Sequence, residues 1–299
     1  MNTKNSLLGI FYALAGGVCW GFSGSCGEYL FKVHGVNSSW LCSLRIISAG
    51  IILLAISLLW YRDSLFALFK NKKDLGMTVL YGVFGLLMSQ FCYLTAISYS
   101  NAGTATVLQY LGPVFIMVIS CLFGRRLPRI GEATALVLAL CGTFLIATHG
   151  NFGSLAISAG ALAFGLLAAL ALVFYTLLPV NIIPKYGTMP VMGVGMVVGG
   201  LVLLPVARPW SYDVSLAPSG WAAFGAIVVV GTVMAFTLYM MGVNKAGAVK
   251  ASVASSVEPV AAAVISAVWL GNKFAIADAV GFAAVISAVI ILSLAKKKA

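Results

Sequence analysis

One acidic residue, Glu258, falls in the middle of a long apolar segment over residues 248–270. If this segment is a helix that crosses a membrane, a rise of about 1.5 Å per residue puts Glu258 near mid-depth. A bare charge there is costly, so the side chain must face inward, pair with another group or carry a proton. It could therefore bind a substrate ammonium group or take up a coupling proton. The competing interpretation is a protonated Glu258 that only joins two helices by a hydrogen bond.

Two prolines mark equivalent places in the chain. Pro259 follows Glu258 directly, and Pro113 lies in an earlier apolar segment. A proline inside a helix cannot donate a backbone hydrogen bond, and its ring displaces the carbonyl group four residues earlier. For Pro113 this is the carbonyl group of Gln109. We predict that Pro113 and Pro259 are hinges.

Polar side chains share helix faces with these residues. Gln109 and Tyr110 precede Pro113 by four and three positions, and Ser255 precedes Glu258 by three. Facing inward, such groups and nearby aromatic rings form the usual lining of a small-molecule site. Trp and Tyr side chains also gather in belts at membrane surfaces, and that alternative stays open for the aromatic candidates. The residues predicted to bind a small-molecule substrate are Trp20, Gln90, Tyr93, Gln109, Tyr110, Tyr175, Tyr239, Ser255 and Glu258.

Two opposite charges lie near the outer ends of the first two apolar segments. Glu28 ends the first segment, and Arg45 lies about two turns into the second. We predict that Glu28 and Arg45 pair and form part of an outer gate. Alternatively, Arg45 extends its charged head to the lipid headgroups.

Ten apolar segments must position these residues. Hydrophobic residues make up 62% of the chain and charged residues 8%, against roughly 45–50% and 25% in soluble domains. The core of a bilayer requires about 20 apolar residues per helix. The connections are too short for a soluble domain, so function must reside in the helices. The sequence therefore predicts an all-α integral membrane protein with ten transmembrane helices, over residues 7–27, 39–60, 76–98, 102–124, 131–149, 155–178, 188–207, 219–242, 248–270 and 275–295.

The basic residues indicate how these helices are oriented. If the N-terminus lies inside, nearly all of the 18 Lys and Arg residues fall in inside connections or tails. Only Lys32, Arg208 and Lys273 fall outside, and Arg45 lies within a helix. This asymmetry follows the positive-inside rule and predicts that both termini are cytoplasmic. It also accounts for the net charge of +11, so we expect no nucleic-acid partner.

The sequence carries no motif of a common enzyme or metal site. HExxH, P-loop and GxSxG patterns are absent, and the six cysteines include no CxxC pair. The two histidines, His34 and His149, lie far apart and have no evident carboxylate partner. We therefore expect no catalytic residue, no metal and no cofactor. A membrane enzyme is kept as a remote alternative.

The chain contains an internal repeat. Residues 101–120 and 244–266 both begin with Asn, contain an Ala-Gly pair and reach a proline followed by Val. We predict two units, residues 1–150 and 151–299. Because each unit holds five helices, an odd number, the second unit enters the membrane from the opposite side. Such inverted repeats are found in alternating-access transporters, whose substrate sites lie near mid-depth.

Trp20-Gly21, Arg45 and the Ala-Gly turn before Pro-Val in both halves resemble the EamA family of the drug/metabolite transporter (DMT) superfamily. TATVLQYLGP (104–113), GTFLIATHGN (142–151) and FYTLLP (174–179) resemble its YicL-type bacterial branch. The resemblance covers essentially the whole chain. It implies a 5+5 inverted repeat in the bacterial inner membrane. It also implies that helices 1–4 and 6–9 of the ten enclose the pocket, with helices 5 and 10 outside it.

The chain departs from the family at the ends of the fourth and ninth helices. Members usually carry Glu after the glycine that ends each of these helices, whereas this chain has Arg125 and Asn272. Any role that the family gives to these Glu positions is therefore in doubt, but the mid-depth site is unaffected.

These observations predict a secondary transporter that moves small amphipathic metabolites across the inner membrane by alternating access. Amino acids, related compounds and drugs are the candidate substrates, and a proton is the candidate coupling ion. Export is the direction that the resemblance implies. A lipid-linked-sugar flippase and a passive facilitator remain alternatives. The first would need a groove open to lipid, and the second would need no alternating gates.

Overall fold

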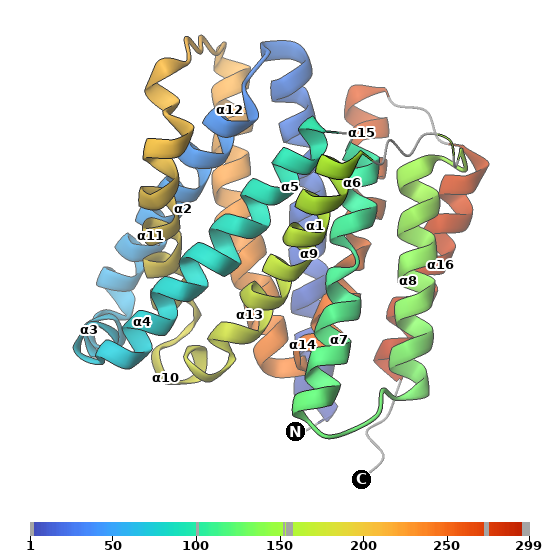
Figure 1. Ribbon diagram of the computed structural model, residues 1–299, viewed down its shortest axis with the longest axis horizontal. Helices are drawn as coiled ribbons and strands as arrows, with labels where there is room; N and C mark the ends of the chain where they lie inside the picture. Colours follow the sequence, from blue (N-terminus) through green and yellow to red (C-terminus); the bar gives the residue numbers. More distant parts are fainter. Residues whose placement is uncertain (1–2, 100–101, 152, 154–157, 272–274, 295–299) are drawn as a thin grey trace.

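Every regular element in the described part of the chain is helical, and the computed structural model arranges these elements as one bundle (Figure 1). It describes residues 3–294 except 100–101, 152, 154–157 and 272–274, so Asn272 lies outside the described residues. The α-helices are α1 (Thr3–His34), α2 (Ser38–Trp60), α3 (Arg62–Lys70), α4 (Lys72–Leu80), α5 (Met88–Ser98), α6 (Ala102–Gln109), α7 (Gly112–Phe123), α8 (Ile130–Thr148), α9 (Ala159–Leu177), α10 (Ile183–Tyr186), α11 (Thr188–Ala207), α12 (Pro218–Val228), α13 (Ala235–Ala246), α14 (Ala248–Ala254), α15 (Glu258–Leu270) and α16 (Ile276–Leu294).

Nine stretches of the described helices are long and apolar enough to cross a membrane, and α16 adds a shorter apolar helix. Each of the ten predicted segments falls on one of these helices. The connection after α2 differs from the prediction because it contains α3, a short amphipathic helix. Leu65 and Leu68 of α3 are buried, whereas Asp63 and Lys70 are exposed. This alternation lets α3 lie along the surface of the bundle.

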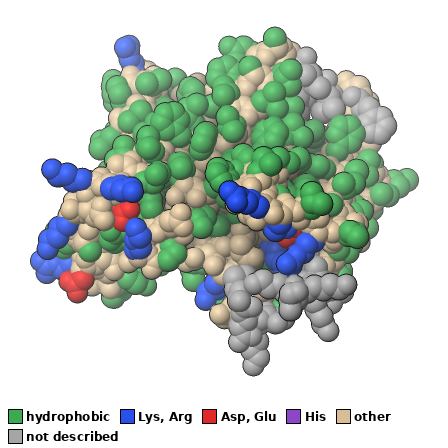
Figure 2. Space-filling view, turned by 60° about the horizontal axis from the view of Figure 1, so that its bottom comes forward, with side chains coloured by type: hydrophobic (Ala, Val, Ile, Leu, Met, Phe, Trp, Pro, Cys, Tyr) green, Lys and Arg blue, Asp and Glu red, His purple; other side chains and the backbone are tan. Residues whose placement is uncertain are grey.

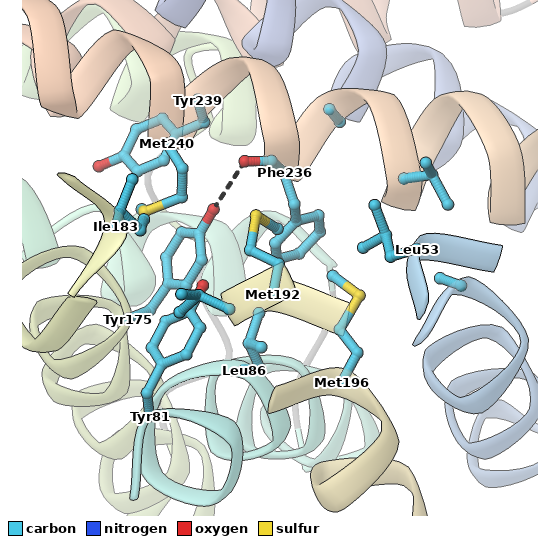
Figure 3. Packing of buried hydrophobic residues seen from close by; sticks show 14 of the residues in the cluster. Leu53, Tyr81, Leu86, Tyr175, Ile183, Met192, Met196, Phe236, Tyr239 and Met240 are labelled. Atoms are coloured by element: carbon cyan, nitrogen blue, oxygen red, sulfur yellow. Dashed lines mark hydrogen bonds between the residues drawn. The ribbon is translucent and has the colours of Figure 1, made fainter. Parts of the chain in front are cut away.

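A large hydrophobic core cluster forms where α1 packs against α13 and α2 packs against α11. Figure 3 shows Met192 and Met196 of α11 beside Phe236 of α13 and Leu53 of α2. All four side chains are buried. Flexible methionines fill irregular gaps between helices, which suits a core that several helices share.

Helices α8 and α16 pack against each other at the edge of the bundle (Figure 1). Gly142 of α8 and Gly281 of α16 meet where the two helices cross. A Cβ atom on Gly142 would lie 2.7 Å from the Gly281 carbonyl oxygen, so both positions require glycine. The family resemblance implied this outer position for the fifth and tenth helices.

The third and eighth spans each contain a π-helical segment that nothing in the sequence analysis predicted. They are η1 (Tyr81–Leu87), between α4 and α5, and η5 (Val229–Met234), between α12 and α13. In η5, the Thr232 hydroxyl donates to the carbonyl group of Ile227, five residues earlier, at 2.9 Å. Single π-helical turns inside α-helices often occur at functional sites.

The fourth and ninth spans are broken at equivalent places. The fourth span divides into α6 and α7, and α7 begins one residue before Pro113. The ninth divides into α14, the 3₁₀ turn η6 (Ser255–Val257) and α15, and α15 begins one residue before Pro259. Both breaks therefore follow from a proline that cannot continue the hydrogen-bond ladder. Gly247, with φ of +89°, makes the tight connection into α14.

The end of the bundle at which α1 begins is basic. Figure 2 turns this end toward the viewer and shows Lys and Arg side chains over α3 and α4 and again near the centre. Asp74 of α4 binds two groups from the connection before α11. It is 3.0 Å from Lys185 Nζ and 2.9 Å from the Tyr186 hydroxyl. The hydrogen bond to Asp74, together with desolvation, raises the pKa of Tyr186.

Candidate functional site

A cavity of about 670 Å³ lies inside the bundle, and both halves of the chain contribute to its wall. Its volume falls in the range of about 300–1,000 Å³ that is usual for small-molecule sites. Eight of the nine predicted binding residues line it, namely Trp20, Gln90, Tyr93, Gln109, Tyr110, Tyr175, Ser255 and Glu258. Of the predicted hinge and gate residues, Pro113, Glu28 and Arg45 also line the cavity, whereas Pro259 does not.

Tyr239, the ninth predicted residue, lies behind the cavity wall instead of in it. Its side chain is fully buried and its hydroxyl is 3.1 Å from the Thr176 hydroxyl. Helical spacing puts Tyr239 on one face with Thr232 and Phe236. In the structure its ring packs between those of Trp20 and Tyr175, with centroids 5.2 Å and 5.5 Å away. Tyr239 therefore supports the wall and does not reach its surface.

Trp20, Tyr175, Phe236 and Tyr239 form a cluster that we call the aromatic floor (Figure 3 shows the last three). Trp20 meets Phe236 edge to face at 5.0 Å, and Tyr175 stacks on Tyr239. The Tyr175 hydroxyl donates to the Phe236 carbonyl oxygen at 3.4 Å. These rings come from three helices, α1, α9 and α13, and those of Trp20, Tyr175 and Phe236 line the cavity.

The cavity opens at the opposite end of the bundle. Lys32, near the end of α1, and His149, after α8, both line it there, and their side chains are 65% and 62% exposed. His149 Nδ1 is 2.9 Å from the carboxylate of Asp278, which is fully buried. The expectation that His149 has no carboxylate partner is therefore wrong. Asp278 is far away in sequence, and the partnership arises because α8 packs against α16.

Glu258 stands at the break in the ninth span, and its carboxylate accepts a hydrogen bond from the Tyr110 hydroxyl at 3.2 Å. Tyr110 lies at the matching break in the fourth span, so the bond joins the two halves. Gly21 lets α1 approach this point, because a Cβ atom there would lie 2.7 Å from the Glu258 carbonyl oxygen. The two broken helices thus meet at this hydrogen bond, and each brings a polar group to the cavity wall.

The expected ion pair between Glu28 and Arg45 is not among the ion pairs of the described residues. Glu28 instead forms an ion pair with Lys32, one helical turn away, and accepts a hydrogen bond from Ser266 at 3.1 Å. Residues four apart on a helix are neighbours, so Lys32 is the nearer partner. Arg45 points into the same cavity as Glu258.

Two other predicted residues, Tyr93 and Gln90, form hydrogen bonds with the fourth span and within the third span, respectively. The Tyr93 hydroxyl is 3.0 Å from the Thr106 hydroxyl. Gln90 donates to the Leu86 carbonyl oxygen, while its own buried side-chain oxygen has no protein partner among the described residues.

The predicted set of binding residues leaves out several polar residues of the cavity. The wall also includes Ser23, Ser25, Ser89, Thr106, Ser252, Ser266 and His149. Helical spacing was a usable signal for some of them, since Ser23 lies three residues after Trp20 and Ser252 three before Ser255. His149 and Ser266 carry no such signal, because only the packing of distant helices brings them to the opening.

Comparison with known proteins agrees with this architecture. The model of the EamA-like transporter family matches the chain twice, over residues 7–148 and 159–294. The chain is 39% identical over 297 residues to a Salmonella typhimurium protein named an uncharacterized inner membrane transporter, YicL, covering 99% of this chain and 98% of that one. It is 26% identical over 241 residues to the uncharacterized transporter YetK of Bacillus subtilis, covering 76% and 71%.

One solved crystal structure, whose description gives no function, has the same fold. Its TM-score to this chain is 0.79 at 18% identity, and the match covers 98% of each chain. The apolar helices and the inner membrane relative identify a multi-pass protein of the inner membrane. With two matches that together span most of its length, the chain belongs to the EamA-like transporter family.

Proposed function

We propose that this protein is a secondary transporter that moves small amphipathic metabolites by alternating access. One observation carries the proposal: a cavity of about 670 Å³ that both halves line, with an acid, a base and aromatic rings in its wall. Aromatic faces would hold an apolar part of the solute, and Gln90, Gln109 and Glu258 would hold its polar groups. Amino acids, related metabolites and amphipathic drugs fit this description.

The orientation is part of the proposal. Basic connections favour the cytoplasmic side, so we place the basic end of the bundle inside the cell. The opening with Glu28 and Lys32 then faces outward, and the aromatic floor closes the inner side. The two five-helix units would enter the membrane from opposite sides. The matched helix breaks before Pro113 and Pro259 support this inverted repeat and the hinge role of both prolines.

Alternating access would require the aromatic floor to open as the outer mouth closes. We propose that the third and fourth spans bend about Pro113 and that the eighth and ninth spans bend about Pro259. Glu258 lies at one of these breaks, so it could couple bending to the uptake of a proton. Export is the proposed direction, by analogy with the family.

The direct test uses purified protein in liposomes, with a panel of amino acids, related metabolites and amphipathic drugs, with and without a pH gradient. We expect at least one solute to accumulate against its own gradient when a pH gradient is imposed. Flux that only runs down the solute gradient would indicate a passive facilitator and contradict the proposal. Protein-free liposomes and liposomes with heat-inactivated protein are the controls.

Removing the aromatic floor should uncouple transport. Tyr239→Ala takes away a fully buried ring that contacts the rings of Trp20 and Tyr175. We expect solute to leak down its gradient and accumulation to fall at least about tenfold, because the inner barrier no longer seals. Tyr239→Phe removes only the hydroxyl group and should retain most accumulation. Leu53→Ala makes a cavity elsewhere in the core, so a similar leak in that variant would show that general loosening, not the floor, is responsible.

A further inference from the structure

The short helix α3, in the connection between the second and third spans, begins at the depth of a membrane surface. The chain leaves the second span through Trp60 and Tyr61, and both side chains are exposed. Trp and Tyr gather where the acyl chains of a bilayer meet its headgroups. Because α3 starts at the next residue, Arg62, it lies close to this boundary.

Helix α3 has two apolar faces, and the bundle covers one of them. Leu65 and Leu68 are buried against neighbouring helices. Phe66 and Phe69, three positions apart, share another face, and their side chains are 46% and 48% exposed. A helix of nine residues is marginal on its own in water. The exposed phenylalanines therefore need an apolar partner outside the bundle.

Basic side chains surround these two rings. Arg62 precedes Phe66 by four positions and Lys70 follows it by four, so the three residues form one stripe. The guanidinium carbon of Arg62 is 5.7 Å from the centre of the Phe66 ring. Lys72 and Lys73, in the first turn of α4, are exposed as well. None of the ion pairs among the described residues involves these four basic residues.

Acidic side chains balance little of this charge. Residues 62–80 contain two acids, and one of them, Asp74, already binds Lys185 and Tyr186. Only Asp63 remains beside four basic groups. Figure 2 shows basic side chains over α3 and α4 with hydrophobic side chains beside them. We call the six residues Arg62, Phe66, Phe69, Lys70, Lys72 and Lys73 the interfacial patch.

We propose that the interfacial patch is a binding site for anionic phospholipid. The two phenylalanine rings enter the acyl region, and the four basic groups contact the phosphate of the headgroup. Free phosphate or an acidic protein could answer the charges, but a lipid also supplies the acyl chains beside Phe66 and Phe69. Leu59 and Trp60, 74% and 71% exposed, already face the lipid directly before α3. This inference concerns how the protein meets the bilayer, so it does not rest on the proposed transport function.

Hydrogen–deuterium exchange of the full-length protein in nanodiscs measures the contact locally. One sample contains phosphatidylcholine alone, and the other contains phosphatidylcholine with about one third phosphatidylglycerol. Each basic residue near an anionic surface raises affinity about fivefold. We therefore expect the amides of residues 62–71 to exchange at least about fivefold more slowly with phosphatidylglycerol. Inorganic phosphate added to the phosphatidylcholine sample should leave their exchange unchanged.

Two double variants test the charges of the patch. Arg62→Gln with Lys70→Gln should remove most of the slowing by phosphatidylglycerol, because it takes the two charges from the stripe that holds Phe66. Arg125→Gln with Arg129→Gln removes two exposed arginines from the connection between α7 and α8, at the same end of the bundle, and is the matched control. It should keep the slowing in α3. Size-exclusion chromatography establishes that each variant is folded.

A third double variant tests the apolar part of the site. Phe66→Ala with Phe69→Ala keeps every charge and introduces a better helix former. Residues 62–71 should nevertheless exchange faster in both lipids, because α3 loses its hold on the acyl region.

Four results would each overturn the inference. The first is equal exchange of α3 in the two lipids, and the second is slowing that survives Arg62→Gln with Lys70→Gln. The third is an equal loss of slowing in the Arg125→Gln, Arg129→Gln control, which would indicate only a general attraction of a basic surface. The fourth is slowing by inorganic phosphate alone, which would identify a free anion as the ligand.

Discussion

Glu258→Gln is expected to abolish uphill transport in liposomes. The glutamine keeps the size of the side chain and an oxygen that can still accept the hydrogen bond of Tyr110, which is 3.2 Å from the carboxylate in the structure. The variant should therefore fold. It loses both the charge that would bind an ammonium group and the site that would take up a proton. Loss of a charged hydrogen bond alone should weaken solute binding about 10- to 100-fold.

Varying the solute concentration separates a role of Glu258 in solute binding from a role in proton coupling. If Glu258 only binds the solute, raising the solute concentration should restore part of the accumulation in Glu258→Gln. If Glu258 also carries the coupling proton, no solute concentration restores it, although exchange of solute across the membrane can continue. Glu258→Asp keeps the acid and should retain part of the activity.

Asp63→Asn removes a carboxylate from the exposed surface of α3 and is the matched control, expected to transport normally. A Glu258→Gln protein that accumulates solute like the wild type at every pH would exclude a role for the acid. The protonated, purely structural Glu258 considered in the sequence analysis would then be the better interpretation.

The sequence predicted the cavity better than it predicted the contacts within it. Helical spacing placed Gln109, Tyr110 and Glu258 on inward faces, because a polar group in an apolar helix has few other places to lie. The same reasoning was wrong for Tyr239. Helical spacing shows which face of a helix a residue occupies, but not whether other side chains cover that residue. Here the rings of Trp20 and Tyr175 cover Tyr239.

The partners of charged residues were harder to predict than their positions. Glu28 and Arg45 lie at similar distances from the ends of consecutive helices, but α1 and α2 pack mainly against other helices. Glu28 pairs instead with Lys32, one helical turn away. The link from His149 to Asp278 spans the two halves of the chain. Such partnerships depend on how helices pack, and a single sequence records little of that packing.

The π-helical segments could not be predicted, because hydrophobic periodicity hardly changes when one turn holds an extra residue. One of these segments, η5, makes a close contact with α1 that the sequence does not indicate. In η5, Gly231 lies so near α1 that a Cβ atom there would be 2.2 Å from both Cβ and Oγ of Ser23. Ser23 also lines the cavity, so this contact fixes the part of α1 that forms the wall.

Gly231→Ala is therefore expected to prevent correct packing of the eighth span on α1. Overpacked cores typically lose about 1–3 kcal/mol, occasionally more, and a contact of 2.2 Å against a Cβ atom has no flexible side-chain end that could move away. We expect a large drop in the yield of monodisperse protein and a lower unfolding midpoint. Size-exclusion chromatography and a thermal unfolding scan in detergent measure both.

Exchanging the side chains between the two helices should reverse the defect. Ser23→Gly removes both clashing atoms, and the next atom of residue 23 near a Cβ on residue 231 is the Cα atom at 3.3 Å, a tight but tolerable contact. The double variant Ser23→Gly with Gly231→Ala should regain most of the yield and stability. Gly225→Ala, in α12, is the matched control, since nothing lies within 4 Å of a Cβ atom there. If Gly231→Ala has the same yield and unfolding midpoint as Gly225→Ala, then η5 does not pack against α1 as described. The position of Ser23 in the cavity wall would then be wrong as well.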